Sequence, residues 1–394
     1  MDAAWLIFLV AIGACVGSFL NVVIHRLPRG MSIVFPPSHC PACGRLIHWH
    51  DNIPLVSWLV LRGRCRRCKA WISPRYLVVE AAAACLAGGL YAWYYLLHRR
   101  AGAGDFAVTW PTYLAHVVLL WGLLACAAMD IGQWIVPVEV CWVVSAVGIV
   151  MAGAGPHPLL PAVSPTAGAM SLAAAIGLGL AMLLRYYDWI PRSFGDADDA
   201  VQFMSSPLRG GRARAQRTII AVAVTGAHGV DPRKEILLEV LFLAPALVLA
   251  AAACVLMIRY PAVRQAWAAA VSPSSGGLAV HVNGLLSALC GFLVGGLWVW
   301  GARILGTLAF GKEAMGRGDV DILASVGAAT GWIVPSVVFF LAPFLGLLWV
   351  LLLRLRRRQR ELPYGPWLAV ATLIVILFYD NFARFILPYF GIGR

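Results

Sequence analysis

Two aspartates stand at the ends of separate apolar runs, at positions that suit acid–base chemistry. Asp130 ends the apolar run 110–129, and Asp319 opens the short apolar run 319–333. Acidic residues in or beside membrane helices are costly and are functional candidates by default. Two such carboxyl groups at one depth suit an aspartyl hydrolase, because one takes a proton from water while the other, protonated, polarises a peptide carbonyl. The alternative is two ordinary helix-end aspartates, solvated among lipid headgroups.

Glycines precede the second aspartate. Gly316 and Gly318 flank Arg317 directly before Asp319. Glycine has no Cβ, so it permits the close backbone approach that an extended substrate beside the carboxylate requires. Upstream of them, Lys312 is interpreted as a cation whose charged end reaches the headgroup level.

Four cysteines form two C-x2-C pairs separated by 21 residues, namely Cys40 with Cys43 and Cys65 with Cys68. Each pair can direct two thiolates at one ion, and two pairs complete the tetrahedral set that zinc prefers. Four thiolates leave no open position for water, so the predicted zinc is structural. The alternative is four buried or disulfide-bonded cysteines, and the predicted cytoplasmic placement argues against disulfides.

The composition excludes an ordinary soluble domain. The 394 residues are 61% hydrophobic and 12% charged, whereas soluble domains carry about 25% charged residues. The 16 Trp, 16 Phe and 11 Tyr exclude low-complexity disorder. The net charge of +13 is clustered between apolar runs. In a membrane protein, clusters of basic residues set the orientation of the chain in the bilayer. We therefore expect membrane lipid as a partner, and no nucleic acid.

Apolar runs long enough to cross a bilayer, about 20 residues each, recur along the chain. They predict an all-α polytopic membrane protein of about ten transmembrane helices, with a small zinc-ribbon-like insert after the first. The runs are 3–24, 76–97, 110–129, 134–153, 166–186, 236–258, 282–309, 334–353 and 366–386, with 319–333 as a shorter tenth.

Basic clusters indicate the orientation. Residues 25–75, hereafter the cysteine segment, hold nine Lys or Arg against one acidic residue, and 187–235 and 354–360 are also basic. The positive-inside rule places all three in the cytoplasm and the N-terminus outside, with Arg99 and Arg100 as exceptions. The predicted divisions are a retained first helix (1–24), the cysteine segment (25–75), helices with Asp130 (76–186), a cytoplasmic loop (187–235) and helices with the GxGD motif at 316–319 (236–394).

Several motifs resemble those of bacterial type IV prepilin peptidases, which are GxGD membrane aspartyl proteases. Residues 311–319 (GKEAMGRGD) are similar to the family signature, residues 17–28 (GSFLNVVIHRLP) to its opening helix, and residues 362–366 (LPYGP) to the motif before its last helix. Both cysteine pairs match as well. The resemblance covers roughly residues 1–150 and 280–390.

The resemblance implies a bifunctional enzyme of the bacterial inner membrane. Such proteins cut the basic leader from type IV prepilins or type II secretion pseudopilins on the cytoplasmic side. They commonly then methylate the new N-terminus with S-adenosylmethionine, and the residues for this step are expected in the cysteine segment. Carried over, Asp130 and Asp319 are the catalytic pair, and the active-site loop comprises Lys312, Glu313, Gly316 and Gly318. Acidic candidates for the leader are Glu80, Glu139, Glu313 and Asp321, with structural pairing to nearby Arg or Lys as the alternative for each.

The chain departs from the family pattern in three places. Asp321 stands at a position where the family usually has Lys. Val138 stands at a position where the family usually has Asp, and Glu139 is the next residue. The two catalytic candidates are 189 positions apart, and the excess contains two apolar runs and the loop 187–235. An even number of added crossings keeps both aspartates on the same side of the membrane.

Two other functional classes are compatible with the pattern. One is a membrane transporter whose aspartates pair with cations and whose cysteine pairs form a zinc docking module. It predicts further intramembrane charges along a pathway, and the mid-helix runs hold few besides Glu239. The other is an inactive family member whose insertion serves as an assembly scaffold, against which the intact Asp130 and Asp319 argue.

Overall fold

The computed structural model describes residues 2–155, 159–191, 193, 232–272, 276–311, 313–354 and 363–390. Within these ranges the chain forms helices and two isolated β-bridges. The α-helices are α1 (Asp2–Arg26), α2 (Val56–Val60), α3 (Arg75–Tyr91), α4 (Phe106–Gln133), α5 (Val138–Gly153), α6 (Pro165–Tyr186), α9 (Pro232–Arg259), α10 (Pro261–Val271), α11 (Leu278–Phe310), α12 (Arg317–Thr330), α13 (Ile333–Arg354), α14 (Gly365–Leu377) and α15 (Tyr379–Ile386). Short turns of other helix types are η1 (Leu27–Arg29), η2 (Trp49–Asn52), η3 (Ala92–Leu96) and η5 (Leu387–Phe390).

The predicted all-α membrane architecture is confirmed. In the described part of the chain, seven helices are long and apolar enough to cross a membrane, or eight if α14 and α15 form one span bent by 83°. Each of the ten predicted runs contains a helix. The count is lower than ten because α5 has 16 residues and α12 has 14. At 1.5 Å per residue these helices are about 24 and 21 Å long, which is less than the hydrocarbon core of about 30 Å.

The chain divides into two compact units. Unit 1 comprises residues 1–140 and 342–394, and unit 2 comprises residues 141–341. Unit 1 therefore carries the cysteine segment and Asp130. Unit 2 carries Asp319 together with α6 and α9, the helices of the predicted insertion.

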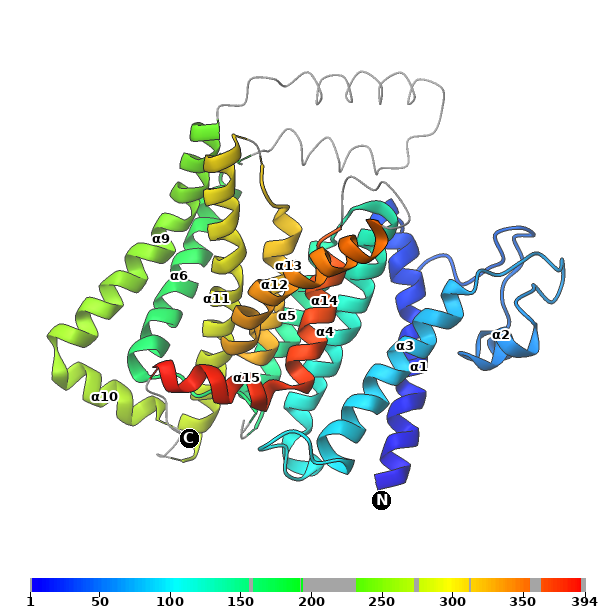
Figure 1. The fold of residues 1–394 in the computed structure, drawn as a ribbon, viewed down its shortest axis with the longest axis horizontal. Coiled ribbons are helices and arrows are strands. Elements are labelled where there is room, and N and C mark those ends of the chain that lie inside the picture. Colours follow the sequence, from blue (N-terminus) through cyan, green and yellow to red (C-terminus); the bar gives the residue numbers. More distant parts are fainter. Residues whose placement is uncertain are drawn as a thin grey trace. The chain divides into compact units, whose positions relative to one another are not determined.

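In unit 1, α1 and α3 cross at glycines of α1 (Figure 1). A Cβ on Gly13 would lie 2.7 Å from the carbonyl oxygen of Ala83, and one on Gly17 would lie 2.6 Å from the Cα of Glu80. Gly13 and Gly17 thus form a GxxxG pair that lets the two backbones touch, as is typical of helices packed in lipid. This contact places the start of α3 firmly against α1.

The last predicted run, 366–386, is a broken helix rather than a straight one. Helix α14 packs against α4 and ends at Leu377, and α15 leaves it at 83°. The Trp93 indole donates a hydrogen bond of 2.9 Å to the carbonyl oxygen of Leu377, and its ring lies 5.9 Å from that of Phe378. A tryptophan of another helix therefore satisfies a backbone acceptor that the break leaves open.

Arg100, an exception to the charge rule, is neutralised inside unit 1. Its side chain is buried, its Nη1 lies 3.4 Å from Oδ1 of Asp380, and its guanidinium lies 3.5 Å from the centre of the Tyr379 ring. The backbone N–H of Ala101 donates to the same carboxylate at 2.7 Å. A paired and buried arginine is a structural link to α15 rather than a free charge that would signal orientation.

In unit 2, α11 and α12 approach each other as closely as α1 and α3 do. A Cβ on Gly291 would lie 2.1 Å from the carbonyl oxygen of Gly327, and one on Gly295 would lie 2.1 Å from that of Leu323. A second GxxxG pair therefore packs α12 against a long membrane helix. Helix α6 packs on α9, with Gly177 against Ala246.

Two predicted regions fall mostly outside the described residues. Of the loop 187–235, residues 187–191, 193 and 232–235 are described, and of the basic cluster 354–360 only Arg354 is.

Candidate functional site

The two cysteine pairs form two copies of one backbone motif. In the first, the N–H of Cys40 donates to the carbonyl of Arg45, and the N–H of Gly44 donates back to Cys40. In the second, Cys65 bonds to Ala70 and Lys69 bonds back to Cys65 in the same pattern. The residue four after the first cysteine has positive φ in both copies, 69° at Gly44 and 59° at Lys69. Each turn is closed by one β-bridge, His39 with Leu46 and Arg64 with Trp71.

The four sulfurs of these motifs converge to a spacing that fits zinc. Each Sγ of Cys40, Cys43, Cys65 and Cys68 lies within 4.8 Å of the others, and the Sγ atoms of Cys40 and Cys68 are 3.8 Å apart. Four sulfurs at about 2.3 Å from a tetrahedral zinc are about 3.8 Å from one another. The cysteine cluster predicted from spacing is therefore present and has the geometry of a structural zinc site.

The local electrostatics of the cluster favour a cation. The backbone N–H groups of Cys68 and Arg67 donate to Sγ of Cys65 and lower its pKa to about 6. The N–H of Ala70 acts in the same direction on Cys68, but desolvation and the neighbouring thiols outweigh it and raise the pKa of Cys68 to about 11. Four thiolates at this spacing repel one another, so a metal ion that binds all four must displace the proton that Cys68 retains.

One ion pair links two parts of the cysteine segment, and one hydrogen bond links the segment to a membrane helix. The Arg66 guanidinium makes a bidentate ion pair with Asp51, at 2.6 to 2.9 Å. This pairing lowers the pKa of Asp51 below its ordinary value. Glu80, a predicted leader contact, is buried in α3 and accepts a hydrogen bond of 2.8 Å from the backbone N–H of Leu55. Glu80 thus holds the start of α2 against α3.

In unit 1, Asp130 is buried in the last turn of α4. Its Oδ2 accepts a hydrogen bond of 3.0 Å from the backbone N–H of Gly365, the first residue of α14. A Cβ on residue 365 would lie 2.8 Å from that same oxygen. Gly365 therefore orients the carboxylate, and only a residue without a side chain allows this contact at the observed distance.

In unit 2, Asp319 lies in the first turn of α12, where the positive end of the helix dipole favours a negative charge. Gly316 is the N-cap of α12, and its carbonyl accepts the N–H of Asp319 at 3.3 Å. A Cβ on Gly316 would lie 3.6 Å from the Asp319 carboxylate, an ordinary contact. Gly318 is the second residue of α12. Lys312 of the predicted loop lies outside the described residues.

A buried arginine ties the loop before α12 to two other helices. Arg303 of α11 lies 3.3 Å from Oε1 of Glu239 in α9 and 3.1 Å from Oε1 of Glu313 in the loop. Glu239 also accepts hydrogen bonds from the Ser193 hydroxyl and the Trp300 indole. Arg303 is 2% exposed and Glu239 is 6% exposed, so these charges neutralise each other out of water.

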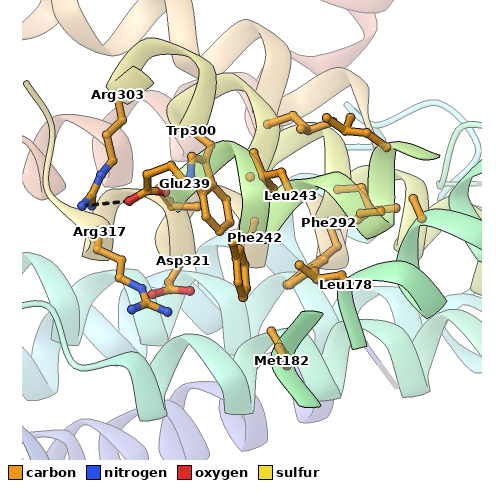
Figure 2. Close-up of a pocket in the computed structure, with 18 of the residues that line it drawn as sticks. Leu178, Met182, Glu239, Phe242, Leu243, Phe292, Trp300, Arg303, Arg317 and Asp321 are labelled. Atoms are coloured by element: carbon orange, nitrogen blue, oxygen red, sulfur yellow. Dashed lines mark hydrogen bonds and ion pairs between the residues drawn. The ribbon is translucent and has the colours of Figure 1, made fainter. Parts of the chain in front are cut away.

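Arg303 and Glu239 lie at one end of a pocket between α6, α9, α11 and α12, with a cavity of about 140 Å³ (Figure 2). Figure 2 shows Arg303, Glu239, Arg317 and Asp321 gathered on one side and apolar side chains such as Phe292 on the other. Arg317 and Asp321 lie two residues before and after Asp319. The pocket thus adjoins the helix turn that carries a catalytic candidate.

Two residues of the site were not predicted individually from the sequence. Gly365 belongs to the LPYGP motif noted above, but the motif does not indicate which side chain it serves. Arg303 is a lone charge inside the apolar run 282–309, and an intramembrane charge is itself a signal of function or pairing. Of the remaining predicted leader contacts, Glu139 is in the first turn of α5 and is exposed.

Comparison with known proteins agrees with the motifs. Residues 11–95 match the Bacterial Peptidase A24 N-terminal domain. A prepilin leader peptidase/N-methyltransferase of Pseudomonas aeruginosa is 27% identical over 98% of this chain and 95% of its own. One of Stutzerimonas stutzeri is 26% identical over 96% and 92%.

A shorter but stronger similarity links the chain to a protein of the same name from Myxococcus xanthus. It is 45% identical over 134 residues, which are 34% of this chain and 36% of that relative. No solved structure matches the chain. The resemblance to prepilin peptidases that the motifs indicate is therefore confirmed, over nearly the whole chain.

Proposed function

We propose that this protein removes the leader peptide of prepilins and methylates the N-terminus that cleavage exposes. The observation that carries the proposal is the similarity to proteins named prepilin leader peptidase/N-methyltransferase over 98% of the chain. Those names support both activities. The finer substrate class, type IV prepilins or type II secretion pseudopilins with a basic leader, follows from the motif resemblance.

The proposed cleavage uses Asp130 and Asp319 as an aspartyl pair. Asp319 is assigned the base that takes a proton from water, because the α12 dipole favours its ionised form. Asp130 is assigned the protonated partner that polarises the peptide carbonyl. Its buried position and its contact with Gly365 fix the direction of the carboxyl group.

The basic leader requires acidic groups on the enzyme. Glu80 and Glu313 have partners within the protein, Leu55 and Arg303 respectively. Asp321 and Glu139 are the better candidates, since Asp321 lies at the charged end of the pocket and Glu139 is exposed. Each would hold a basic residue of the leader by charge complementarity.

The proposal includes two cofactors with different support. A structural zinc rests on the four converging sulfurs. S-adenosylmethionine as methyl donor rests on the names of the relatives alone. The proposed location is the bacterial inner membrane, with the N-terminus outside and the active site facing the cytoplasm, because the cysteine segment is strongly basic.

The transporter alternative is weakened by one observation. It requires intramembrane charges that face a pathway, and Glu239 is the main candidate. Glu239 is instead paired with Arg303 at 3.3 Å. This pairing accounts for both charges without transport.

The test is cleavage of a prepilin by the purified full chain in lipid vesicles. Asp130→Asn and Asp319→Asn should each abolish release of the leader, because each removes one proton-transfer group. Asp105→Asn is the matched control: Asp105 is the N-cap of α4, the helix that carries Asp130, and Asn caps a helix equally well. Cleavage that survives in either active-site variant refutes the aspartyl pair. Absence of cleavage by the unchanged chain with any prepilin refutes the peptidase itself.

A further inference from the structure

The cysteine segment exposes far more apolar surface than a water-facing module should. Helix α2 buries none of its five residues. Val56, Leu59 and Val60 are 53%, 60% and 68% exposed, and Trp49 is 80% exposed. Exposed apolar side chains that share one helix face, as Val56, Leu59 and Val60 do, mark a contact with a protein or a membrane.

The opposite side of α2 is fixed to the second cysteine motif. The Trp58 indole donates to the carbonyl oxygen of Ile72 at 3.3 Å, and its ring lies 2.9 Å from where a Cβ on Gly63 would be. Val56, Leu59 and Val60 lie three and four residues apart, so they share one face. Since Trp58 anchors the helix, that apolar face points away from the cysteine motif.

The depth of α2 along the membrane helices is set by its contact with Glu80. The N–H of Leu55, directly before α2, donates to Glu80 at 2.8 Å. Glu80 lies five residues into α3 from Arg75, which is about 7.5 Å along the axis. Both α3 and α1 are candidate membrane spans. Figure 1 shows α2 alongside α1 and α3 rather than beyond their ends. With Arg75, the first residue of the α3 span, taken as the headgroup level, this depth falls within the range of about 5–10 Å to which interfacial helices bury their apolar faces in the headgroup and acyl boundary.

The net positive charge of the cysteine segment indicates which kind of membrane surface it would contact. It holds nine Lys or Arg and one acidic residue, Asp51, and Asp51 is paired with Arg66. Arg62 and Arg64 closely follow α2. Basic residues beside an apolar face are complementary to a leaflet that contains anionic phospholipid.

We propose that the cysteine segment is seated on the membrane, with Val56, Leu59 and Val60 among the acyl chains and Arg62 and Arg64 at anionic phospholipid headgroups. The surface is occupied by lipid and not by a soluble partner. This seating holds the cysteine cluster at the membrane surface, beside the ends of α1 and α3. The inference depends on α1 and α3 crossing the bilayer and is independent of the catalytic assignment.

The test uses the zinc-loaded full chain in vesicles of phosphatidylcholine with phosphatidylglycerol. A phospholipid with a photoreactive group in its acyl chain is cross-linked to the protein residues that contact lipid. In a parallel sample, hydroxyl radicals modify the residues that contact water. Mass spectrometry then locates the cross-linked and the modified residues. Residues 56–60 should be cross-linked to lipid as strongly as the exposed Val248 of the membrane helix α9. Modification of 56–60 by hydroxyl radicals alone would overturn the proposal, and leave the face to a protein partner.

A charge variant separates headgroup binding from apolar insertion. One Lys or Arg at an anionic surface changes binding by about fivefold, so Arg62→Gln with Arg64→Gln should lower the ratio of lipid to water labelling at α2 by about 25-fold. Arg99→Gln, which removes an exposed cation outside the segment, should leave the ratio unchanged. An unchanged ratio in the double variant, or an equal fall with Arg99→Gln, would overturn the role of anionic lipid. Zinc content of each variant shows whether the cysteine motifs remain folded.

Discussion

Gly365→Ala tests whether the backbone of α14 orients the Asp130 carboxylate. The added Cβ would lie 2.8 Å from Oδ2, whereas ordinary contacts begin at 3.4 Å, so the two atoms must separate by about 0.6 Å. The hydrogen bond from Gly365 to Oδ2 is 3.0 Å, and a shift of that size moves it beyond the usual limit of about 3.2 Å. Asp130 is assigned the protonated form, and a hydrogen bond between neutral groups contributes about 0.5–1.5 kcal/mol.

The expected effect is therefore a fall in kcat for leader cleavage of about 2- to 13-fold, since each 1.36 kcal/mol corresponds to tenfold. Alanine at the first turn of a helix is well tolerated, so the midpoint of thermal unfolding should fall little. Methylation of a prepilin that is already cleaved should continue, because it does not use Asp130.

The matched control for this change is Gly132→Ala. Gly132 lies two residues after Asp130 in α4, and a Cβ there meets nothing within 4 Å. The Gly132→Ala variant should cleave the leader at the rate of the unchanged protein. Normal turnover by Gly365→Ala, or an equal loss in Gly132→Ala, would refute the assigned role of the Gly365 contact.

Three further predictions concern the metal cluster and the buried charges. Cys40→Ser should lower zinc well below one ion per chain, measured by elemental analysis; an unchanged ratio would exclude this cluster. In zinc-free protein at pH 7, iodoacetamide should alkylate Cys65 faster than Cys68, because the thiolate is the nucleophile. The lowered pKa of Cys65 keeps that thiolate ionised until the pH falls through about 6, so the rate should drop there; equal rates would contradict the hydrogen bonds to Cys65. Arg303→Leu should cost about 3–5 kcal/mol in the free energy of unfolding, since it leaves Glu239 buried without its partner; adding Glu239→Gln should recover part of that loss, and no recovery would contradict the pairing.

The helical membrane architecture and the cysteine cluster could be predicted from the sequence, because both depend on local patterns. An apolar run of sufficient length satisfies its own backbone hydrogen bonds only as a helix, so all ten predicted runs contain one. A C-x2-C pair forms its turn with hydrogen bonds between residues four and five apart. The second pair repeats the first, so convergence of the four sulfurs follows from spacing.

The contacts that orient individual side chains were decided by tertiary structure. Gly365 and Asp130 are 235 residues apart, and no pattern in either segment indicates the hydrogen bond between them. At the break after Leu377, the carbonyl oxygen accepts a hydrogen bond from Trp93, which is 284 residues away. The sequence shows Asp380, Asn381 and Arg384 after the break, but polar residues alone do not show that the helix bends there by 83°.

The same limit applies to charge. A count of charges along the sequence includes Arg100 and Arg303 in the same way as the exposed cations of the cysteine segment. In the folded protein each lies buried against a carboxylate, of Asp380 in one case and of Glu239 in the other. Hydropathy and spacing determine which segments enter lipid and which sulfurs meet, since those depend on neighbours along the chain. Whether a charge is free or neutralised depends on which residue the fold brings within about 4 Å, and only the packing of distant helices decides that.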